Sequence, residues 1–494
     1  MSDEKQPQSS HSEAPLQGAN DGSALLDSEE LKRSVTADVK VEEEETTSSG
    51  ARTPNGRTRK QLIASNLQFG ALCVSMIVLG WNDGSTGPLI PRMRKVYNVG
   101  YLVVSLIFVV ACVGFILGAL ANVWLTDRLG FGKVIVLGAH SPVIWAGCQT
   151  LSSRTGAALQ LITYSVQSAA PPFAAFVVVN LFNGFGGALQ DSQANGFVGS
   201  LSHYQETKMG ILHAAYGVGA FAAPLVATQF AQMERWSFHY LTSLGLAVIN
   251  TIILAVVFRF KEHGECLAAG GEDVHVSTAS QEKGKFGQIM KNRSVHLLAF
   301  FILFYVGVEV TIGGWIVTFI IEDRHGGPSS GYVSSGFFGG LTLGRVVLLP
   351  INKWVGERNV FFIYAALAFG LDFVIWFVPS LVGNAVTVSI IGMLLGPMYP
   401  IAMNQASRIL PPWLLTGAIG WIGGFGQAGS ALIPFITGAI SEKHGIKSLH
   451  PLLVAMMGAM IVLFALTPNH PPPELARPST LESEGTDVKE KVTA

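Results

Sequence analysis

The chain has 494 residues, of which 49% are hydrophobic and only 13% are charged, with a mean hydropathy of +0.42. Soluble domains carry about 25% charged residues, so this composition argues against a water-soluble fold and indicates a membrane protein. The formal net charge is −1, which gives no electrostatic reason to expect nucleic acid as a partner. Four cysteines show neither metal-ligand spacing nor the pattern of a disulfide framework, which argues against redox chemistry.

Both ends of the chain are polar. Residues 1–60 mix Ser, Thr, Pro, Gly and charged residues and include an acidic run at 42–45. Such a segment holds too little apolar surface to offset the entropy of ordering, so we predict a disordered tail. It lacks the apolar stretch of a secretory signal peptide, and the first hydrophobic span must therefore target the chain. Residues 468–494 are predicted to be a second disordered tail.

Apolar stretches long enough to cross a hydrocarbon core, about 20 residues each, follow one another between the tails. Helices rather than a barrel satisfy the backbone of segments this long and apolar. A polar, Gly-rich loop at 260–293 divides the stretches into six and six. The sequence thus predicts an all-α membrane protein with one half at 61–259 and the other at 294–467. The twelve expected spans are 62–89, 101–126, 133–169, 173–200, 209–231, 237–259, 294–320, 330–352, 359–379, 383–408, 413–440 and 449–467.

The distribution of Lys and Arg predicts the orientation of these spans. If both termini are cytoplasmic, the inner ends and loops hold 17 such residues and the outer ones hold seven, leaving Arg154 aside. We therefore expect both tails and the 260–293 loop to face the cytoplasm. Arg345 counts among the inner charges, whereas Arg92, Arg94 and Lys95 depart from the rule on the outer side.

Spacings recur across the central loop, as in transporters built from duplicated halves. The loop at 125–130 has a degraded counterpart at 351–356, at a displacement of 226 in the numbering. Other matches are displaced by 207 or 209, and with 55 glycines in the chain chance is the alternative explanation. The displacement falls from 226 to 209, so the first half holds 17 surplus residues near 139–172. We interpret these residues as an insertion or an incorrectly spliced gene model. The matching pairs are Gly210 and Gly417, Gly217 and Gly424, Gly219 and Gly426, Gly187 and Gly396, and Asn195 and Asn404.

Acidic residues inside membrane spans are costly and usually face an aqueous cavity or a partner. Asp83 lies in a part of the first span where glycines and a proline weaken the helix. Asp191 is four residues from Asn195, so the two share a helix face. A carboxyl group in such a place can carry a proton when its exposure changes, and the alternative is a hydrogen-bonded carboxyl that joins two helices. Glu309 fits both hypotheses, and we expect Asp372 to be structural or close to an interface.

Aromatic residues beside amides suit a polyhydroxylated ligand, because rings pack against C–H faces while amides bond hydroxyl groups. Trp and Tyr are also ordinary anchors at the membrane interface. The sequence contains no phosphate-binding loop, zinc spacing or nucleophile elbow, so we expect neither ATP-driven pumping, nor enzyme activity, nor a cofactor or metal. The candidate ligand-binding residues are Trp81, Asn82, Gln190, Asn195, Trp315, Tyr399, Asn404, Trp421 and Gln427.

Residues 118–133, which run from the end of the second expected span into the loop after it, resemble the signature loop of the major facilitator superfamily. The resemblance covers about 60–467 and implies two pseudo-symmetric six-helix bundles. It also implies that Asp127 and Arg128 belong to a cytoplasmic gate between the halves. The counterpart loop in the second half has Lys353 in place of the acid.

A narrower resemblance is to the fucose permease branch of that family, the fucose–galactose–glucose proton symporters, and to related fungal permeases. By this resemblance Asp83 and Asp191 are the proton-coupling pair, and Glu309 is a third candidate. The sequence differs from the branch in having Asp rather than Glu at 191, and Glu at 309 where an amide is common. The matching motifs are Trp81-Asn-Asp83, Asp191 to Asn195, Tyr305 to Glu309 with Gly314-Trp315, Tyr399-Pro400, and Gly423 to Gly426 with Pro434.

We therefore predict a secondary transporter whose halves rock about a central site and couple uptake of a sugar or similar polar solute to protons. Proton-driven efflux is one alternative, because Gly217, Gly219 and Pro224 loosely resemble an antiporter signature. A non-transporting nutrient sensor is another, favoured only by the acidic N-terminal tail. We expect a monomer in the plasma membrane or the vacuolar membrane, with the bilayer, the solute and protons as its partners.

Overall fold

The computed structural model describes residues 57–129, 131–138, 159–272 and 285–469. The chain divides into one unit that ends at Leu62 and a second that begins at Ile63. The second unit holds the body of every apolar helix and is described below. All regular structure in the described ranges is helical.

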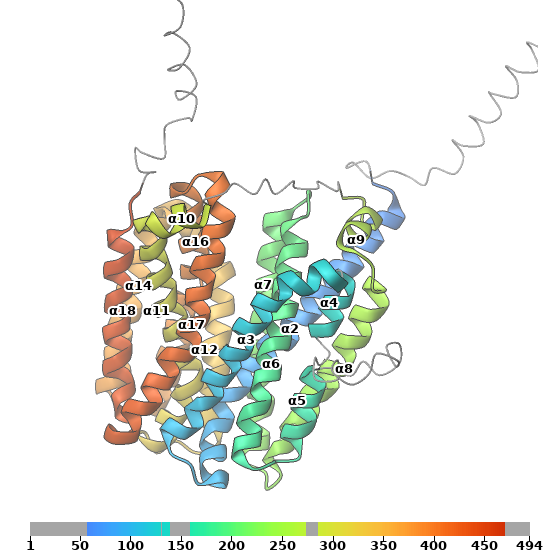
Figure 1. The fold of residues 1–494 in the computed structure, drawn as a ribbon. Helices are drawn as coiled ribbons and strands as arrows, with labels where there is room; N and C mark the ends of the chain where they lie inside the picture. The colour runs from blue at the N-terminus through green and yellow to red at the C-terminus, as the bar shows by residue number, and fades with distance from the viewer. Residues whose placement is uncertain (1–56, 130, 139–158, 273–284, 470–494) are drawn as a thin grey trace, which may run out of the picture. The chain divides into compact units, whose positions relative to one another are not determined.

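Two groups of long helices form the second unit, and they are joined through the short helices α9 (His263–Ala269) and α10 (Lys285–Lys291) (Figure 1). The N-terminal group consists of α2 (Arg59–Tyr97), α3 (Tyr101–Leu129), α4 (Phe131–Gly138), α5 (Leu159–Ser168), α6 (Phe173–Gly199), α7 (Gln205–Ala231) and α8 (His239–Phe258). The C-terminal group consists of α11 (Arg293–Glu322), α12 (Tyr332–Val347), α13 (Leu349–Val355), α14 (Glu357–Phe377), α15 (Leu381–Leu395), α16 (Met398–Ile409), α17 (Pro412–His444) and α18 (Leu449–Leu466).

Local sequence signals set several helix ends. The side-chain oxygen of Asn292 accepts hydrogen bonds from the backbone N–H groups of Ser294 (2.9 Å) and Val295 (3.3 Å), which caps the start of α11. Gly445 ends α17 with a φ of 74°, a left-handed conformation that glycine adopts without strain. The ends of these spans therefore follow ordinary capping chemistry.

The described helices account for twelve membrane spans. Ten spans are long and apolar enough on their own, and α12 with α13, bent by 52°, makes an eleventh. The helices α4 and α5 both pack against α6 and α8, and they flank residues 139–158, which lie outside the described residues. Their eight and ten residues rise about 27 Å in total, close to the thickness of one hydrocarbon core. The expected insertion falls largely on the undescribed stretch and stays a prediction.

The packing of helices repeats between the two halves. Among the neighbours of α3, the helix that it packs against most extensively is α6 of the same half. For α12 in the second half, that neighbour is α15. Between the halves α3 packs on α17, and α12 packs on α7. The helices α3, α6 and α7 of the first half correspond to α12, α15 and α17, which come six spans later. Contacts within and between the halves therefore both follow a pseudo-twofold arrangement.

Glycines at equivalent positions allow this close packing. A Cβ atom added at Gly114 would lie 2.0 Å from the carbonyl oxygen of Leu181, and one at Gly340 would lie 2.0 Å from that of Ser389. Gly340 follows Gly114 at the same displacement in the numbering, 226, that relates the two signature-like loops. The repeat seen in the sequence therefore corresponds to the same backbone contact in each half.

Candidate functional site

The two halves are joined at one end of the spans. We call the end at which α9 and α10 lie the linker side, and the opposite end the far side (Figure 1). On the far side Arg94 and Tyr101 of the N-terminal half both bond to the carboxylate of Glu322 at the end of α11. The Arg94 guanidinium also lies 3.5 Å from the ring centroid of Tyr101. We call these three residues the far-side cluster. In it the Glu322 carboxylate pairs with Arg94, one of the outer basic residues that depart from the Lys and Arg rule.

Further contacts close the far side along both interfaces between the halves. The backbone N–H of Leu102 donates to Oε2 of Glu442 at 3.2 Å, which joins the start of α3 to the end of α17. The side-chain amide of Gln232, after α7, donates to the carbonyl oxygen of Pro328 at 3.2 Å. The far side is thus sealed where α3 meets α17 and where α7 approaches α12.

Glycines of α6, α7 and α17 differ in how closely they are packed. Gly217 on α7 lies so close to α12 that an added Cβ would be 2.2 Å from the Thr342 hydroxyl oxygen. A Cβ at Gly424, its counterpart on α17, meets no atom within 4 Å, and the same holds at Gly196 and Gly210. These three glycines thus make no close helix contact, unlike Gly217.

Asp83 lies within α2, and its side chain has an exposed surface despite its position inside a span. The Tyr216 hydroxyl of α7 donates to Oδ2 of Asp83 at 2.7 Å, and the Asn82 amide donates to Oδ1 at 3.1 Å. Asn82 in turn accepts a hydrogen bond of 2.6 Å from Asn183 of α6. Three helices of the N-terminal half thus hold this carboxyl group in place.

Asp191 is the second carboxyl group of this region. The Asn195 amide donates to Oδ1 of Asp191 and to its carbonyl oxygen, both at 2.9 Å, as expected for residues four apart on a helix. Asp191 is half-buried and interacts electrostatically with Asp83 and with Tyr399 of α16. It therefore lies where the two halves face each other.

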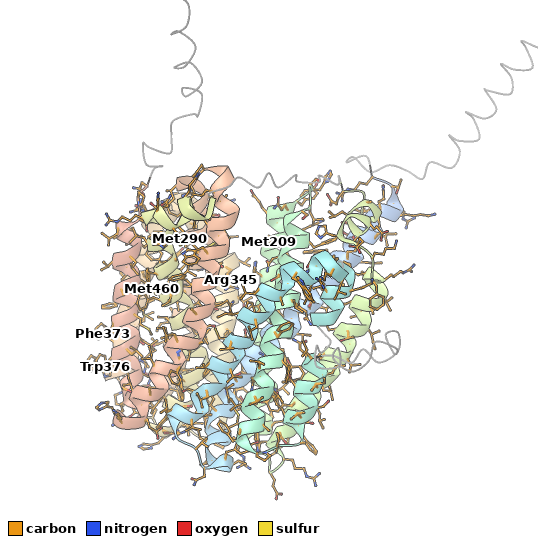
Figure 2. All side chains as sticks on the ribbon, viewed as in Figure 1. Met209, Met290, Arg345, Phe373, Trp376 and Met460 are labelled. Atoms are coloured by element: carbon orange, nitrogen blue, oxygen red, sulfur yellow. The ribbon has the colours of Figure 1, made fainter. Side chains whose placement is uncertain are left out.

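The C-terminal half contributes an acid and a base. Glu309 on α11 and Arg345 on α12 interact electrostatically with each other and with the hydroxyl groups of Tyr305 and Tyr216. Glu309 is also within electrostatic range of Asp83. Arg345 is labelled in Figure 2, between the ribbons of the two halves in this view. We call the resulting set the central site: Asp83, Asp191, Tyr216, Tyr305, Glu309, Arg345 and Tyr399.

Arg345 was not among the residues expected from sequence to bind ligand. It counts there among the basic residues of the inner span ends and loops, and the structure places it within α12, with its Nε donating to the carbonyl oxygen of Gly396 at 3.4 Å. A basic residue inside an apolar helix is itself a signal of function. Arg345 lies seven residues before the end of the expected span 330–352, so this signal was present in the sequence.

Four of the candidate ligand-binding side chains lie away from the central site. The Trp81 indole donates to the Ser243 hydroxyl of α8 at 3.0 Å, and Gln190 is 1% exposed inside the N-terminal half. Trp315 is fully buried and donates to the carbonyl oxygen of Pro434 at 3.1 Å. Asn404 donates to the Glu357 carboxylate and joins α16 to α14. These side chains hold helices together.

Other candidates border the space between the halves or lie beside it. Asn82, Asn195 and Tyr399 belong to or adjoin the central site, as described above. Trp421 and Gln427 are half-buried on α17, and the carbonyl oxygen of Gln427 accepts a contact of 3.1 Å from the Cys112 thiol of the other half. Gln427 is therefore near the junction of the halves, whereas Trp421 packs against His296 and Phe425 of its own half.

The remaining sequence predictions concern single residues outside the central site. Asp127 is in α3, but its side chain lies outside the described residues; Arg128 is exposed, 4.4 Å from the ring centroid of Trp124 on its own helix. Asp372 is fully buried and bonds His450 of α18 at 2.9 Å, in keeping with the structural role expected for it.

This architecture defines a multi-pass membrane transporter: two pseudo-symmetric helical halves with charged groups at their junction. Residues 72–412 match the model of the Major Facilitator Superfamily, and the chain belongs to this family. The resemblance on which the fold was predicted is thus confirmed, together with the all-helical twelve-span architecture. The family consists of transporters and not of enzymes, as expected from the sequence.

Two curated relatives come from different organisms. The chain is 24% identical to Bypass of stop codon protein 6 of Saccharomyces cerevisiae, over 80% of this chain and 81% of that protein. It is 20% identical to the glucose/mannose transporter GlcP of Bacillus subtilis, over 67% of this chain and 77% of that protein.

Solved structures show the same fold. A D-xylose-proton symporter superposes with a TM-score of 0.64 at 12% identity, covering 83% of this chain and 98% of that one. The fucose:proton symporter of E. coli superposes with a TM-score of 0.54 at 14% identity, covering 83% of this chain and 100% of that one. At such identities the likeness concerns the fold.

Proposed function

We propose that this protein is a secondary active transporter that couples uptake of a small polar solute, a sugar, to proton entry. The observation that carries the proposal is Asp83, a carboxyl group with an exposed surface inside a membrane span, hydrogen-bonded by Tyr216 and Asn82. A charged carboxylate in this setting is costly to enclose, and a proton removes that cost. Asp191 is the second proton carrier, and Glu309 the third ionisable acid of the site.

The solute binds beside these carboxyl groups. Asn82 and Asn195 offer amides next to Asp83 and Asp191, and Tyr399 offers a ring and a hydroxyl group from the other half. Trp421 and Gln427 extend this surface along α17. A hexose presents hydroxyl groups to the amides and C–H faces to the rings. The curated relative from Bacillus subtilis is a glucose/mannose transporter, which supports a hexose as the solute.

Alternating access follows the rocker-switch motion of the two halves. The state described here is closed on the far side by the far-side cluster. The excess of Lys and Arg supports a cytoplasmic location of the linker side, the 260–293 loop and both tails, and with this orientation the state is closed toward the outside. In the outward-open state Asp127 and Arg128 close the cytoplasmic side. The protein acts as a monomer in the plasma membrane or the vacuolar membrane.

Uptake into proteoliposomes under an imposed pH gradient tests the proposal. The solutes are glucose, mannose, galactose, fucose and xylose, with an organic acid and an amphipathic drug for comparison. We expect at least one sugar to accumulate above its equilibrium level when the outside is acidic, and to equilibrate without accumulation when the gradient is collapsed with a protonophore. Accumulation of none of the sugars would contradict the proposal.

A further inference from the structure

The Asn82 side chain is held by two residues outside the central site. The side-chain amide of Asn183 on α6 donates to Oδ1 of Asn82 at 2.6 Å. The Tyr164 hydroxyl of α5 lies 3.4 Å from Oδ1 of Asn82 and 3.4 Å from Oδ1 of Asn183, so it can donate to either. Asn183 and Tyr164 are 5% and 1% exposed. The oxygen of the Asn82 amide is therefore occupied by buried donors of its own half.

These donors fix which way the Asn82 amide faces. An asparagine side chain has one acceptor oxygen and an NH2 group with two donors. Because Asn183 occupies the oxygen of Asn82, the NH2 group is directed to Oδ1 of Asp83 at 3.1 Å. Turning the amide over would place oxygen against oxygen at Asp83 and NH2 against NH2 at Asn183. Asn82 therefore meets the central site as a hydrogen-bond donor, and one N–H remains after the bond to Asp83.

The fold itself does not require this pair of amides. The displacement of 226 in the numbering makes Val308 the equivalent of Asn82 in the second half. The displacement of 209, which relates this part of the fourth span to the tenth, makes Gly392 the equivalent of Asn183. The second half packs its helices in the same pattern with no polar side chain at either position. Burying amides is costly, so the pair in the first half favours a task at the site over a task in packing.

We propose that Asn183, supported by Tyr164, is a positioning residue that fixes Asn82 as a hydrogen-bond donor beside Asp83, so that Asn82 and Asp83 together select a hydroxyl group of the solute. This inference rests on the proposed function and deepens it. A hydroxyl oxygen accepts from the remaining N–H of Asn82 while the hydroxyl group donates to a carboxyl oxygen of Asp83. A hydrogen atom at that position of a sugar leaves both protein groups unmatched, and a fluorine atom accepts weakly but cannot donate.

Sugar analogues measure this selection. Among glucose, mannose, galactose, fucose and xylose, the sugar that exchanges fastest serves as the probe, and its monodeoxy and monofluorodeoxy derivatives compete with it in proteoliposomes at equal pH on both sides. At one position of the sugar we expect hydroxyl to be preferred to hydrogen by at least about tenfold, with fluorine between them. In Asn183→Leu the Asn82 amide can turn, so that preference should fall to within about threefold, while the preferences at other positions stay unchanged.

Two further variants separate positioning from packing. Asn180 lies one turn before Asn183 on α6 and is 6% exposed, but it accepts a bond of 3.4 Å from Gln167 of α5. Asn180→Leu should therefore lower the melting temperature without changing the preference. Tyr164→Phe removes only a hydroxyl group and should weaken the preference less than Asn183→Leu does.

Three results would overturn the proposal. One is an unchanged preference in a folded Asn183→Leu protein. Another is an equal loss of preference in Asn180→Leu, because that would be a general effect of disturbing α6. The third is a natural protein that takes every deoxy derivative as well as the parent sugar.

Thermal unfolding in detergent tests the contact without any solute. Asn82→Ala and Asn183→Leu remove the two ends of one hydrogen bond, so the double variant should melt close to the less stable single variant and not lower by the sum of the two losses. If no sugar is accumulated but this coupling is seen, the proposed function fails while the positioning of Asn82 stands. If sugars accumulate and the two losses add, the positioning by Asn183 fails while the proposed function stands.

Discussion

Asp83 combines three properties that are seldom found together in one side chain: it lies in a span, it has an exposed surface, and it is bonded to a tyrosine and an amide. Its charge can therefore be met by water when the site is open, and becomes costly when the halves close around it. Asp372, by contrast, is fully buried against His450 between two helices of one half. Neutralising Asp83 should therefore affect transport, whereas neutralising Asp372 should affect stability.

Replacing Asp83 by Asn should abolish accumulation while preserving exchange. The amide mimics the protonated carboxyl group, so solute can still cross, but no proton moves with it. We expect the ratio of internal to external sugar under a pH gradient to fall to about one, with exchange within about tenfold of the natural protein. Asp191→Asn should behave in the same way.

The matched control for these variants is Asp372→Asn. It weakens the contact with His450, so we expect a lower melting temperature but proton-driven accumulation per folded protein like that of the natural chain. Tracer accumulation and counterflow on the same vesicles check both expectations. Asp83→Asn vesicles that still concentrate sugar would show that this carboxyl group is structural.

At the scale of helices, small residues decide how the spans pack. The sequence indicated the repeat behind these contacts, because glycines recur at a displacement of 226 in one part of each half and of 207 or 209 in another. It did not indicate which side chains turn toward the central site. Trp81 and Gln190 lie beside Asp83 and Asp191 in sequence, but a step of one residue rotates a side chain by about 100° around a helix, into the bundle interior.

A methyl group at Gly114 should push α3 away from α6. Its Cβ would lie 2.0 Å from the carbonyl oxygen of Leu181, and backbone cannot yield as a side chain can. We expect Gly114→Ala to cost about 1–3 kcal/mol of stability, measured as a lower melting temperature in detergent. Gly70→Ala is the control, since no atom lies within 4 Å of that added Cβ. Equal melting of the two variants would refute the close contact of α3 and α6.

The docking of α9 should depend on pH. The His263 ring packs 5.0 Å from Phe131 and 5.5 Å from Phe197, between centroids, and burial lowers the pKa of this imidazole below its ordinary value. The folded state therefore favours neutral His263. Its contribution to stability is complete above the ordinary histidine pKa of about 6.5 and is lost as the pH falls through the lower folded value.

Hydrogen exchange checks this pH dependence. Amide protection in α9 should fall when the natural protein is taken from about pH 7.5 to about pH 4.5, after correction for the intrinsic exchange rate. His263→Phe keeps an aromatic ring without a titrating group, and its protection should change less. A protection loss of equal size in both proteins would assign the effect to other groups.

For the whole molecule, pseudo-symmetry explains both the fold and its present state. The number of spans and the division into halves could be predicted from hydropathy and from the repeat. Which side is closed could not, because closure depends on contacts such as that of Arg94 with Glu322, which join residues 228 positions apart. The outer basic residues were visible in the sequence as an anomaly, but their partner was not.

Removing the charge of Glu322 should loosen the far side. Glu322→Gln takes away the anion that Arg94 and Tyr101 share, so the far side should open more often. We expect a cysteine placed at Thr86, in a background without native cysteines, to react about threefold or more faster with a membrane-impermeant thiol reagent applied outside. Glu357→Gln, which removes an anion bonded within the C-terminal half, is the control. An unchanged ratio of outside to inside labelling would mean that the cluster does not hold this state.

The coupling of solute to proton movement is the central claim, and one measurement tests it directly. Sugar is added to proteoliposomes in weakly buffered medium with no gradient, and the external pH is recorded with a glass electrode or a dye. Symport predicts that inward sugar flux carries protons with it, so the medium becomes alkaline, and Asp83→Asn should abolish the signal while exchange persists. Acidification of the medium would instead show antiport, and transport of sugar with no pH change in the natural protein would contradict proton coupling.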